Sequence, residues 1–318
     1  MRGAFLDLDT VSHEGDVDLT PLRRVLTELH TFGTTPAEQL TERVADAEVV
    51  FTNKVKLNAP TLARFTRVRL ICVAATGTNN VDLDAAHGRG IAVCNVPTYS
   101  TLSVVQLVFA FILNLTQHLK EYETLLQQGA WRRTPQFTLL DYPIRELAGK
   151  RLGILGYGDI GKAVAKVAEA FGMQVLVGPR NADDKRPGRI PLVELLPQVD
   201  VLSVHVPLLP ETRNLIGGGE LALMKHDALL INCARGGIVD EQALAEALRA
   251  GKLGGAGIDV LSEEPPIHGN PLLKPGIPNL IVTPHIAWAT REARQRVIVE
   301  MAANIEAFKK GDKRNRVA

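Results

Sequence analysis

Three short segments late in the chain carry polar residues that could act chemically on a small anion. Arg235 precedes two glycines, Glu264 precedes two prolines, and His285 follows a Thr-Pro pair. An arginine holds a carboxylate through two parallel hydrogen bonds, and a histidine can exchange a proton with a ketone oxygen. A neighbouring glutamate orients such a ring and favours its protonated form. The set therefore predicts reduction of a 2-keto acid, with the reverse oxidation using the same groups.

Each of these residues also has a purely structural explanation. Arg235 could form a structural ion pair, Glu264 could be a solvated loop charge, and His285 could be a satisfied histidine of the core. The functional interpretation depends on their combination. All three follow apolar runs that read as strands, and ligands of open α/β sheets bind at the carboxyl ends of strands.

A glycine-rich segment gives the second chemical signal. Gly156, Gly158 and Gly161 form the pattern G-x-G-x-x-G, with Asp159 and Ile160 before the last glycine. Alone this pattern is weak, because it also makes a tight strand–helix turn. Here it follows a strand pattern and opens a helical one, which makes it a strong dinucleotide-binding signal. Glycine lets the backbone approach a pyrophosphate, and the N–H groups of the helix N-terminus bind its charge.

The end of the next strand indicates which dinucleotide binds. Proteins that bind NAD usually carry an acid there for the ribose 2′-hydroxyl, but this sequence has Pro179 followed by Arg180, with Arg186 and Arg189 nearby. An arginine can pair with a 2′-phosphate, and the missing acid removes repulsion against it. We expect NADPH to be preferred, with NAD as the alternative cofactor. The competing explanation is that Arg180 is a solvated loop charge.

Short apolar runs alternate with helical patterns along the whole chain, which is typical of parallel α/β sheets. We expect strands at Ala4–Leu8, Glu48–Thr52, Arg69–Ala74, Ile91–Cys94, Arg151–Leu155, Gln174–Val177, Asp200–His205, Ala228–Asn232, Gly255–Asp259 and Leu280–Thr283. We expect helices at Pro21–His30, Pro36–Ala45, Pro60–Phe65, Thr101–Gln128, Lys162–Phe171 and Arg291–Lys309. The last helix is amphipathic and should cross back to the first part of the chain.

Composition narrows the class of protein. A chain of 318 residues suits two domains. The formal net charge of +1 comes without a basic stripe, so no nucleic-acid partner is expected. The longest apolar stretch, Ser103–Leu115, is too short to span a bilayer, so we expect a soluble, cytoplasmic protein with no membrane partner. Cys72, Cys94 and Cys233 lack CxxC spacing and read as buried reduced thiols, and no metal is expected.

Together these segments closely resemble the D-isomer-specific 2-hydroxyacid dehydrogenase family over essentially the whole chain. The resemblance is carried by ATGTNNVD at residues 75–82, NVPTYST at 95–101, GYGDIG at 156–161, NCARGGIVDE at 232–241 and HIAWAT at 285–290. The first and last of these look most like its glycerate dehydrogenase/hydroxypyruvate reductase group. The activity implied is NAD(P)H-dependent reduction of hydroxypyruvate or glyoxylate to D-glycerate or glycolate.

The resemblance also implies a fold and roles for individual residues. The expected fold class is α/β: a doubly wound Rossmann-type dinucleotide-binding domain at 99–286, and a flavodoxin-like, discontinuous substrate domain at 1–98 and 287–318. Arg235 would bind the substrate carboxylate, His285 would be the acid/base and Glu264 its partner. Backbone N–H groups of Thr76 and Gly77 would also hold the carboxylate. The cofactor would be lined by Thr101, Gly156, Gly158, Asp159, Ile160, Gly161, Arg180, Val206, Pro207, Thr212, Cys233, Ala234 and Asp259.

The sequence leads to further expectations about the substrate pocket, the departures from the family pattern and the oligomeric state. Lys54 or Asn53, after a strand, could reach the substrate, and Trp288 could wall its pocket or else pack between the domains. Pro179 departs from the acid common in the family, and Gln106 stands where many members have Glu. The long helix at Thr101–Gln128 resembles the element through which the family forms homodimers. Two other functions remain open: a nucleotide-sensing binding protein of corepressor type, and a dehydrogenase of another small anion such as formate or phosphite.

Overall fold

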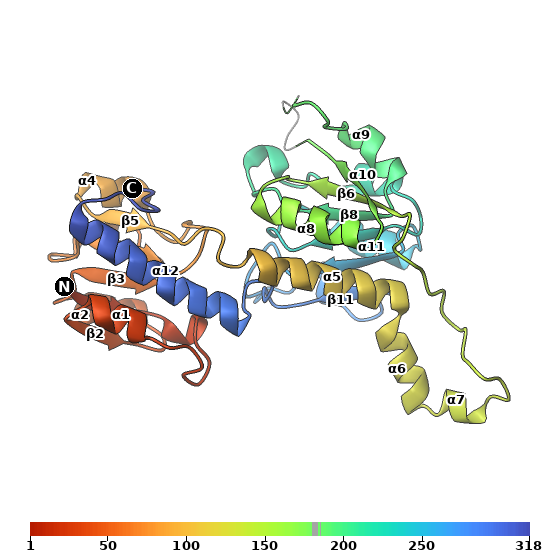
Figure 1. Ribbon diagram of the computed structural model, residues 1–318, viewed down its shortest axis with the longest axis horizontal. Helices are drawn as coiled ribbons and strands as arrows, with labels where there is room; N and C mark the ends of the chain where they lie inside the picture. Colours follow the sequence, from red (N-terminus) through yellow and green to blue (C-terminus); the bar gives the residue numbers. More distant parts are fainter. Residues whose placement is uncertain (180–183, 185) are drawn as a thin grey trace. The chain divides into compact units, whose positions relative to one another are not determined.

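The computed structural model describes residues 1–179, 184 and 186–318. The chain divides into two compact units, one formed by Met1–Ser100 with Trp288–Ala318 and the other by Thr101–Ala287. Each unit is built on one parallel sheet with helices on its faces (Figure 1). The predicted α/β class is therefore confirmed.

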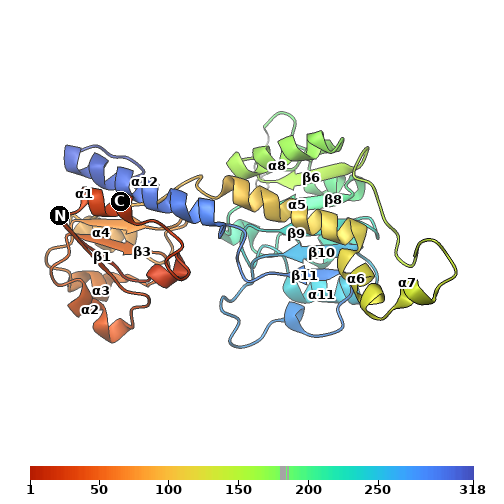
Figure 2. The same ribbon diagram turned by 60° about the horizontal axis from the view of Figure 1, so that its bottom comes forward.

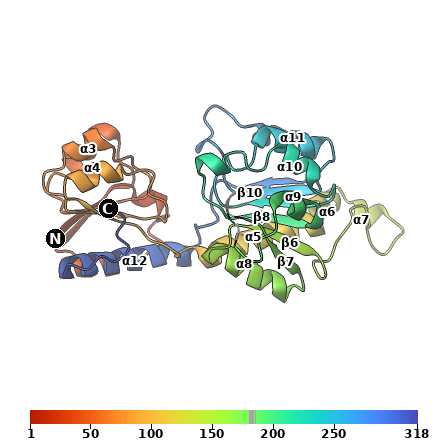
Figure 3. The same cartoon turned by 90° about the horizontal axis from the view of Figure 1, so that it is seen from above.

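The first unit contains a five-stranded sheet in the order β2-β1-β3-β4-β5, which is the flavodoxin-like order. Its strands are β1 (Arg2–Phe5), β2 (Glu28–Thr31), β3 (Val49–Thr52), β4 (Leu70–Val73) and β5 (Ala92–Cys94). Its helices are α1 (Thr20–Val25), α2 (Leu40–Arg43), α3 (Ala59–Ala63), α4 (Leu83–Gly88) and α12 (Arg291–Lys310). Figure 3 shows α12 on one face of this sheet and α3 and α4 on the other.

The inner strand β4 shows how this sheet contributes side chains to two cores. Leu70 and Cys72 face the cluster that includes α12, whereas Ile71 and Val73 face the cluster under α3 and α4. Successive side chains of a strand point to opposite faces, so a strand buried on both faces needs an uninterrupted apolar run. That run is what the sequence shows.

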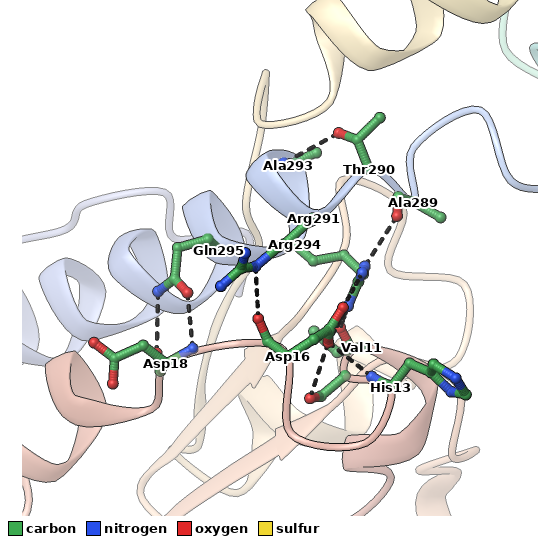
Figure 4. A network of polar contacts seen from close by, with 11 residues as sticks. Val11, His13, Asp16, Asp18, Ala289, Thr290, Arg291, Ala293, Arg294 and Gln295 are labelled. Carbon is green, nitrogen blue, oxygen red and sulfur yellow. Dashed lines mark hydrogen bonds and ion pairs between the residues drawn. The ribbon is translucent and has the colours of Figure 1, made fainter.

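The last helix of the chain is tied to the first unit by polar contacts as well as by its apolar face (Figure 4). Arg294 makes a bidentate ion pair with Asp16, with contacts of 2.7 and 2.6 Å. Gln295 exchanges two hydrogen bonds with the backbone of Asp18. The hydrogen bond from Arg294 holds the pKa of the Asp16 carboxyl well below its usual range. These contacts join segments separated by about 280 residues in the sequence. They hold the two separate stretches of chain together in one unit.

One predicted helix of this unit is wrong in its second half. The helix expected at Pro21–His30 ends at Val25, and β2 begins at Glu28. β2 is an edge strand with mostly exposed side chains, held by its parallel pairing to β1. Because its stability comes from backbone hydrogen bonds rather than apolar burial, no hydrophobic alternation marked it in the sequence. The sequence prediction also missed α4, which Asp82 caps by accepting a hydrogen bond from the Ala85 amide.

The second unit contains a six-stranded parallel sheet in the order β11-β10-β9-β8-β6-β7. Its strands are β6 (Arg151–Leu155), β7 (Gln174–Val177), β8 (Val201–Val204), β9 (Leu229–Asn232), β10 (Gly255–Ile258) and β11 (Leu280–Val282). Its helices are α5 (Thr101–Gln117), α6 (Leu119–Gln127), α7 (Ala130–Arg133), α8 (Asp159–Ala170), α9 (Leu192–Leu195), α10 (Gly218–Leu223) and α11 (Glu241–Arg249). α5 and α8 cover one face, and α10 and α11 cover the other (Figure 3).

The single helix predicted at Thr101–Gln128 is also wrong, because it breaks at His118. This residue takes the left-handed conformation with φ of 52°, so α5 ends and α6 sets off at 54° to it. The apolar pattern cannot reveal such a break, since both helices keep a helical period. Figure 2 shows α6 and α7 extending away from the sheet of this unit as an arm, which we define as residues 118–145.

No single helix in the described part of the chain is both long and apolar enough to cross a membrane. The bent pair α5 and α6 passes the same test on length and composition together. Most residues of α5 that give it this character are buried against the sheet and α8, among them Val108, Phe111 and Ile112.

Candidate active site

The glycine-rich loop joins β6 to α8 at the point where the sheet order reverses. β6 lies between β7 and β8, so the chain leaves β6 to one side and later returns on the other. A Cβ on Gly156, whose φ is +94°, would lie 2.6 Å from the backbone of His205, and one on Gly161 would lie 2.2 Å from the Gly156 carbonyl oxygen. Both glycines are therefore required by the packing of the loop itself.

Gly158 differs from the other two glycines in this loop. A Cβ at this position would meet nothing within 4 Å, and Gly158 is the N-cap of α8, a helix of 12 residues. The missing side chain therefore leaves open space directly before the N–H groups of the first helical turn, including those of Asp159, Ile160 and Gly161. This arrangement fits a pyrophosphate, which binds where the backbone can be approached closely and the helix N-terminus is positive.

The segment after β8 lies against this glycine loop. The His205 amide donates to the Leu155 carbonyl at 2.6 Å, and the Thr212 hydroxyl donates to the Pro207 carbonyl at 2.7 Å. The first bond brings Val206 against Gly156, and the second holds Thr212 against Pro207, the next residue along this segment. The half-buried His205 contacts the Ser203 hydroxyl through its ring nitrogen Nε2 at 2.9 Å, and desolvation lowers its pKa to about 4. The lowered pKa favours the neutral form of His205, whose backbone supports the loop through the bond to Leu155.

The three segments that carry the predicted catalytic residues follow three neighbouring strands. Arg235 follows β9, Glu264 follows β10 and His285 follows β11, and these strands are adjacent in the sheet. Asn232, the last residue of β9, shapes the first segment: its side chain donates to the Arg235 carbonyl and accepts from the Ala234 amide, each at 3.0 Å. The exposed Arg235 side chain donates to the Ala234 carbonyl at 2.7 Å.

Glu264 and His285 form a hydrogen-bonded pair. His285 Nδ1 lies 2.6 Å from Glu264 Oε2, and Glu264 Oε1 accepts a hydrogen bond from the Leu261 amide at 2.9 Å. Because a carboxylate can only accept, Nδ1 of His285 is the donor and Nε2 is the nitrogen left to face a substrate. The two side chains are 35% and 26% exposed, so the pair is accessible without being fully solvated.

Asp259 holds the backbone of the His285 segment in place. Its carboxylate is buried and accepts from the Thr283 hydroxyl at 2.6 Å, the Ile286 amide at 2.8 Å and the Ala287 amide at 2.9 Å. Burial raises the pKa of the Asp259 carboxyl, although these hydrogen bonds act to lower it. His285 has a φ of 55°, and its amide donates to the Asp259 carbonyl at 2.8 Å. The family resemblance implied that Asp259 lines the cofactor, but it did not reveal this anchoring contact.

The neighbouring Cys233 and Ala234 lie at the carboxyl end of β9. Cys233 is buried, and burial raises the pKa of its thiol well above the ordinary value. Cys72 and Cys94 are also buried and free, so the prediction of three buried reduced thiols is confirmed. Thr101 begins α5, and the Gln106 position lies further along this helix.

In the first unit, the predicted substrate residues lie on three segments: the loop after β3, the loop after β4, and the residues before α12. The Thr76 hydroxyl donates to the Val96 carbonyl at 3.0 Å, and Asn95 donates to the Thr76 carbonyl at 2.8 Å. Within the described part of the chain, the backbone N–H groups of Thr76 and Gly77 donate no hydrogen bond. Both are therefore available to an anion. The Trp288 ring packs edge-on against Tyr99 of the same unit, with 6.3 Å between ring centroids.

The loop that carries Lys54 is organised by a residue that the sequence analysis overlooked. The buried Asp7 carboxylate accepts from the amides of Asn53 at 2.9 Å, Lys54 at 2.6 Å and Val55 at 3.1 Å. Three consecutive amides are thus fixed by one acid from the loop after β1. The available signal was an acid inside the predicted strand Ala4–Leu8, where a charge in an apolar run needs a partner.

The residues assigned to the cofactor's adenosine end are described only in part. Arg180 lies outside the described residues, whereas Pro179 is half-buried directly beyond the end of β7. No acid therefore occupies the position that follows β7, as the sequence indicated.

Comparison with known proteins agrees with this geometry. Residues 109–287 match the model of the "D-isomer specific 2-hydroxyacid dehydrogenase, NAD binding domain". The chain is 45% identical over 278 residues to a glycerate dehydrogenase of Methylorubrum extorquens, covering 87% of this chain and 88% of the relative. It is 40% identical over 281 residues to a hydroxypyruvate reductase of Blautia hydrogenotrophica, covering 87% of each. The crystal structure of D-lactate dehydrogenase from Aquifex aeolicus, complexed with NAD and lactic acid, superposes with a TM-score of 0.79 at 32% identity, covering 98% of this chain and 96% of the other.

Proposed function

This chain belongs to the D-isomer-specific 2-hydroxyacid dehydrogenase family and is an oxidoreductase with a nicotinamide cofactor, and we propose that it reduces hydroxypyruvate or glyoxylate to D-glycerate or glycolate. The observation that carries the proposal is the 2.6 Å pair between Glu264 and His285, which follow β10 and β11, while Arg235 follows β9 on the other side of β10. The similarity to a glycerate dehydrogenase and a hydroxypyruvate reductase supports this choice of substrate.

The three residues would divide the reaction between them. Arg235 would bind the substrate carboxylate, because its fork of N–H donors matches two carboxylate oxygens. The bound nicotinamide would supply the hydride to C2 of the keto acid. His285 would give the proton on Nε2 to the carbonyl oxygen, which becomes the hydroxyl, and would regain a proton from water. Glu264 would hold the ring and stabilise its protonated form through Nδ1.

The first unit would serve as the substrate domain, with bounds near 1–98 and 287–318, and residues 99–286 would form the dinucleotide-binding domain. The amides of Thr76 and Gly77 would contribute donors to the substrate carboxylate. Lys54 would contact the substrate. This role is supported by the loop that carries Lys54, which Asp7 holds in a fixed conformation. Trp288 would limit substrate size from its position beside Tyr99.

The cofactor would lie along the carboxyl edge of the six-stranded sheet. The Gly156–Gly161 loop would bind the pyrophosphate, and Val206, Pro207, Thr212, Cys233, Ala234, Asp259 and Thr101 would line the rest of its site. The preferred cofactor would be NADPH, because Pro179 replaces the acid that usually accepts from the ribose 2′-hydroxyl. Arg180 would pair with the 2′-phosphate.

A panel of 2-keto acids assayed with NADPH and with NADH tests both parts of the proposal. We expect the highest kcat/KM for hydroxypyruvate or glyoxylate with NADPH, and a reduced preference for NADPH in Arg180→Ala. Lys166→Ala is the matched control, because it removes an exposed cation from the outer face of α8. Equal efficiency with both cofactors, or an unchanged preference in Arg180→Ala, contradicts the cofactor assignment. Failure with every keto acid contradicts the activity.

The arm would mediate homodimer formation. Large apolar side chains are exposed along it, namely Leu119, Leu126, Trp131, Phe137, Leu140 and Ile144, and Phe137 is 93% exposed. Such a concentration is unusual on a free surface and typical of an interface. We expect a particle of twice the 34.5 kDa chain mass in static light scattering at micromolar concentration. Replacing Phe137 and Leu140 with aspartate should shift the particle toward the monomer, and a monomeric parent protein rules the assignment out.

A further inference from the structure

The segment after β7 makes an excursion and returns to the strand it left. The Ile190 amide donates to the carbonyl of Val177, the last residue of β7, at 3.0 Å. The chain therefore returns to the carboxyl end of β7 at Ile190, and we call the intervening residues 178–189 the excursion. Arg189 precedes the closing bond and so lies beside the strand end, although it is 12 residues beyond it in the sequence.

The Arg189 side chain reaches from this strand end to the glycine loop. Its guanidinium carbon lies 5.4 Å from the centroid of the Tyr157 ring, and Tyr157 is the residue between the first two glycines of G-x-G-x-x-G. A guanidinium within about 6 Å of an aromatic face is attracted by the ring. The side chain is only 14% exposed, so its position is set by packing as well as by charge.

In dinucleotide-binding sheets, the region between the glycine loop and the end of the next strand holds the adenosine ribose of the cofactor. The pyrophosphate lies on the glycine loop, and the adenosine ribose presents its 2′ position toward the end of the next strand. Arg189 contacts the glycine loop through Tyr157 and lies next to the end of β7, where Pro179 stands in place of the usual acid. An arginine there meets a 2′-phosphate with a planar fork of donors and meets no competing carboxylate from the strand end.

Asp184, the acid of the excursion that the structure describes, makes only a long contact with Arg189. Asp184 is 5% exposed and forms a bidentate pair with Arg186, with both contacts at 2.6 Å. Its distance to Arg189 Nε is 3.7 Å, which is beyond hydrogen-bond range. Arg186 therefore neutralises this carboxylate more directly than Arg189 does. The arrangement leaves Arg189 with a favourable electrostatic environment and with donors that a phosphate can take up.

We propose that Arg189 recognises the 2′-phosphate of the cofactor, with Tyr157 holding its guanidinium group in the orientation that a phosphate needs. This inference rests on the NADPH preference proposed above and adds a specificity residue to it. It differs from the assignment of Arg180, because Arg189 is far from the strand end in sequence and is brought back by the Ile190–Val177 bond. The competing explanation is structural: Arg189 would only fasten the excursion to the glycine loop.

Binding of two nucleotides to the cofactor-free protein separates these explanations without any measurement of turnover. Adenosine 2′,5′-bisphosphate and 5′-AMP differ only in the 2′-phosphate, and isothermal titration gives the dissociation constant of each. Hydrogen bonds to charged groups contribute about 1.5–3 kcal/mol, which is about a tenfold to hundredfold difference in affinity. We expect Arg189→Gln to reduce the preference for the bisphosphate by that factor while the affinity for 5′-AMP stays within about twofold.

Two further variants complete the test. Arg189→Lys keeps the charge and the attraction to Asp184 but loses the planar fork, so we expect its preference for the bisphosphate to fall as well. Lys166→Gln removes an exposed cation from the same helix that the glycine loop opens, and its preference should equal that of the parent protein. A purely structural Arg189 would instead weaken binding of both nucleotides in parallel, and the lysine variant would restore it.

The outcomes distinguish this inference from the proposal on which it rests. If the parent protein prefers the bisphosphate and both Arg189 variants keep that preference, Arg189 is not the recognition residue, and the NADPH assignment stands. If the parent protein binds the two nucleotides equally, both the NADPH preference and the role of Arg189 are overturned.

Discussion

Replacing His285 with asparagine is expected to lower kcat for hydroxypyruvate by about 10²–10⁴-fold, the usual cost of losing a general acid. Asparagine keeps a polar side chain of similar volume near Glu264 but cannot transfer a proton to the substrate at neutral pH. Because the glycine loop lies at a different strand end, the dissociation constant for the nicotinamide cofactor should change little. Initial rates of NADPH oxidation and a fluorescence titration of the cofactor measure the two quantities.

His268, which lies in the same unit as His285, offers a matched control for this substitution. His268 Nδ1 contacts Glu263 Oε1 at 2.7 Å, so it forms a second histidine–glutamate pair of nearly equal length. The His268 side chain is 80% exposed and lies in the loop between β10 and β11. We expect His268→Asn to retain parental turnover. Near-normal kcat in His285→Asn, or an equal loss in both variants, contradicts the assignment of His285 as the proton donor.

Arg235→Ala is expected to produce a loss of similar size that falls largely on KM. Two charge-assisted hydrogen bonds to the substrate carboxylate are each worth about 1.5–3 kcal/mol, so their removal should lower kcat/KM by about 10²–10⁴-fold. Arg235→Lys should recover only part of this loss, because an ammonium group cannot reproduce the bidentate fork. Steady-state kinetics with hydroxypyruvate as the varied substrate gives both constants.

The control for Arg235 is Arg249→Ala, which removes an exposed arginine from the last turn of α11 in the same unit. This variant should keep the parental kcat/KM. If Arg235→Ala leaves KM for hydroxypyruvate unchanged, Arg235 does not bind the substrate carboxylate, and another cation must do so.

The parts of the site that the sequence predicted are those with strong local signals. The glycine loop was recognisable because Gly156, Gly158 and Gly161 stand between a strand and a helix pattern. The strands β9, β10 and β11 could be predicted because their apolar runs are nearly uninterrupted. The segments of Arg235, Glu264 and His285 were expected at the carboxyl ends of strands, and in the structure those strands are β9, β10 and β11, which are consecutive in the sheet.

The features that the sequence did not predict depend on contacts between distant residues or on backbone conformation. β2 exists because it pairs with β1, and the break before α6 exists because His118 adopts a left-handed conformation. Asp7 organises a loop 46 residues away in the sequence. Arg189 reaches the glycine loop only because one backbone hydrogen bond closes the excursion after β7. None of these contacts leaves a periodic signal in the sequence.

The central claim is that this protein transfers hydride from a nicotinamide cofactor to C2 of a small 2-keto acid. Incubation with hydroxypyruvate and NADPH doubly deuterated at C4, followed by mass spectrometry and chiral separation of the product, measures that transfer directly. The account predicts D-glycerate with one deuterium at C2 from the parent protein, and a yield lower by about 10²–10⁴-fold from His285→Asn at equal enzyme concentration. Glycerate without deuterium at C2, the L isomer, or no glycerate at all from the folded parent protein would contradict it.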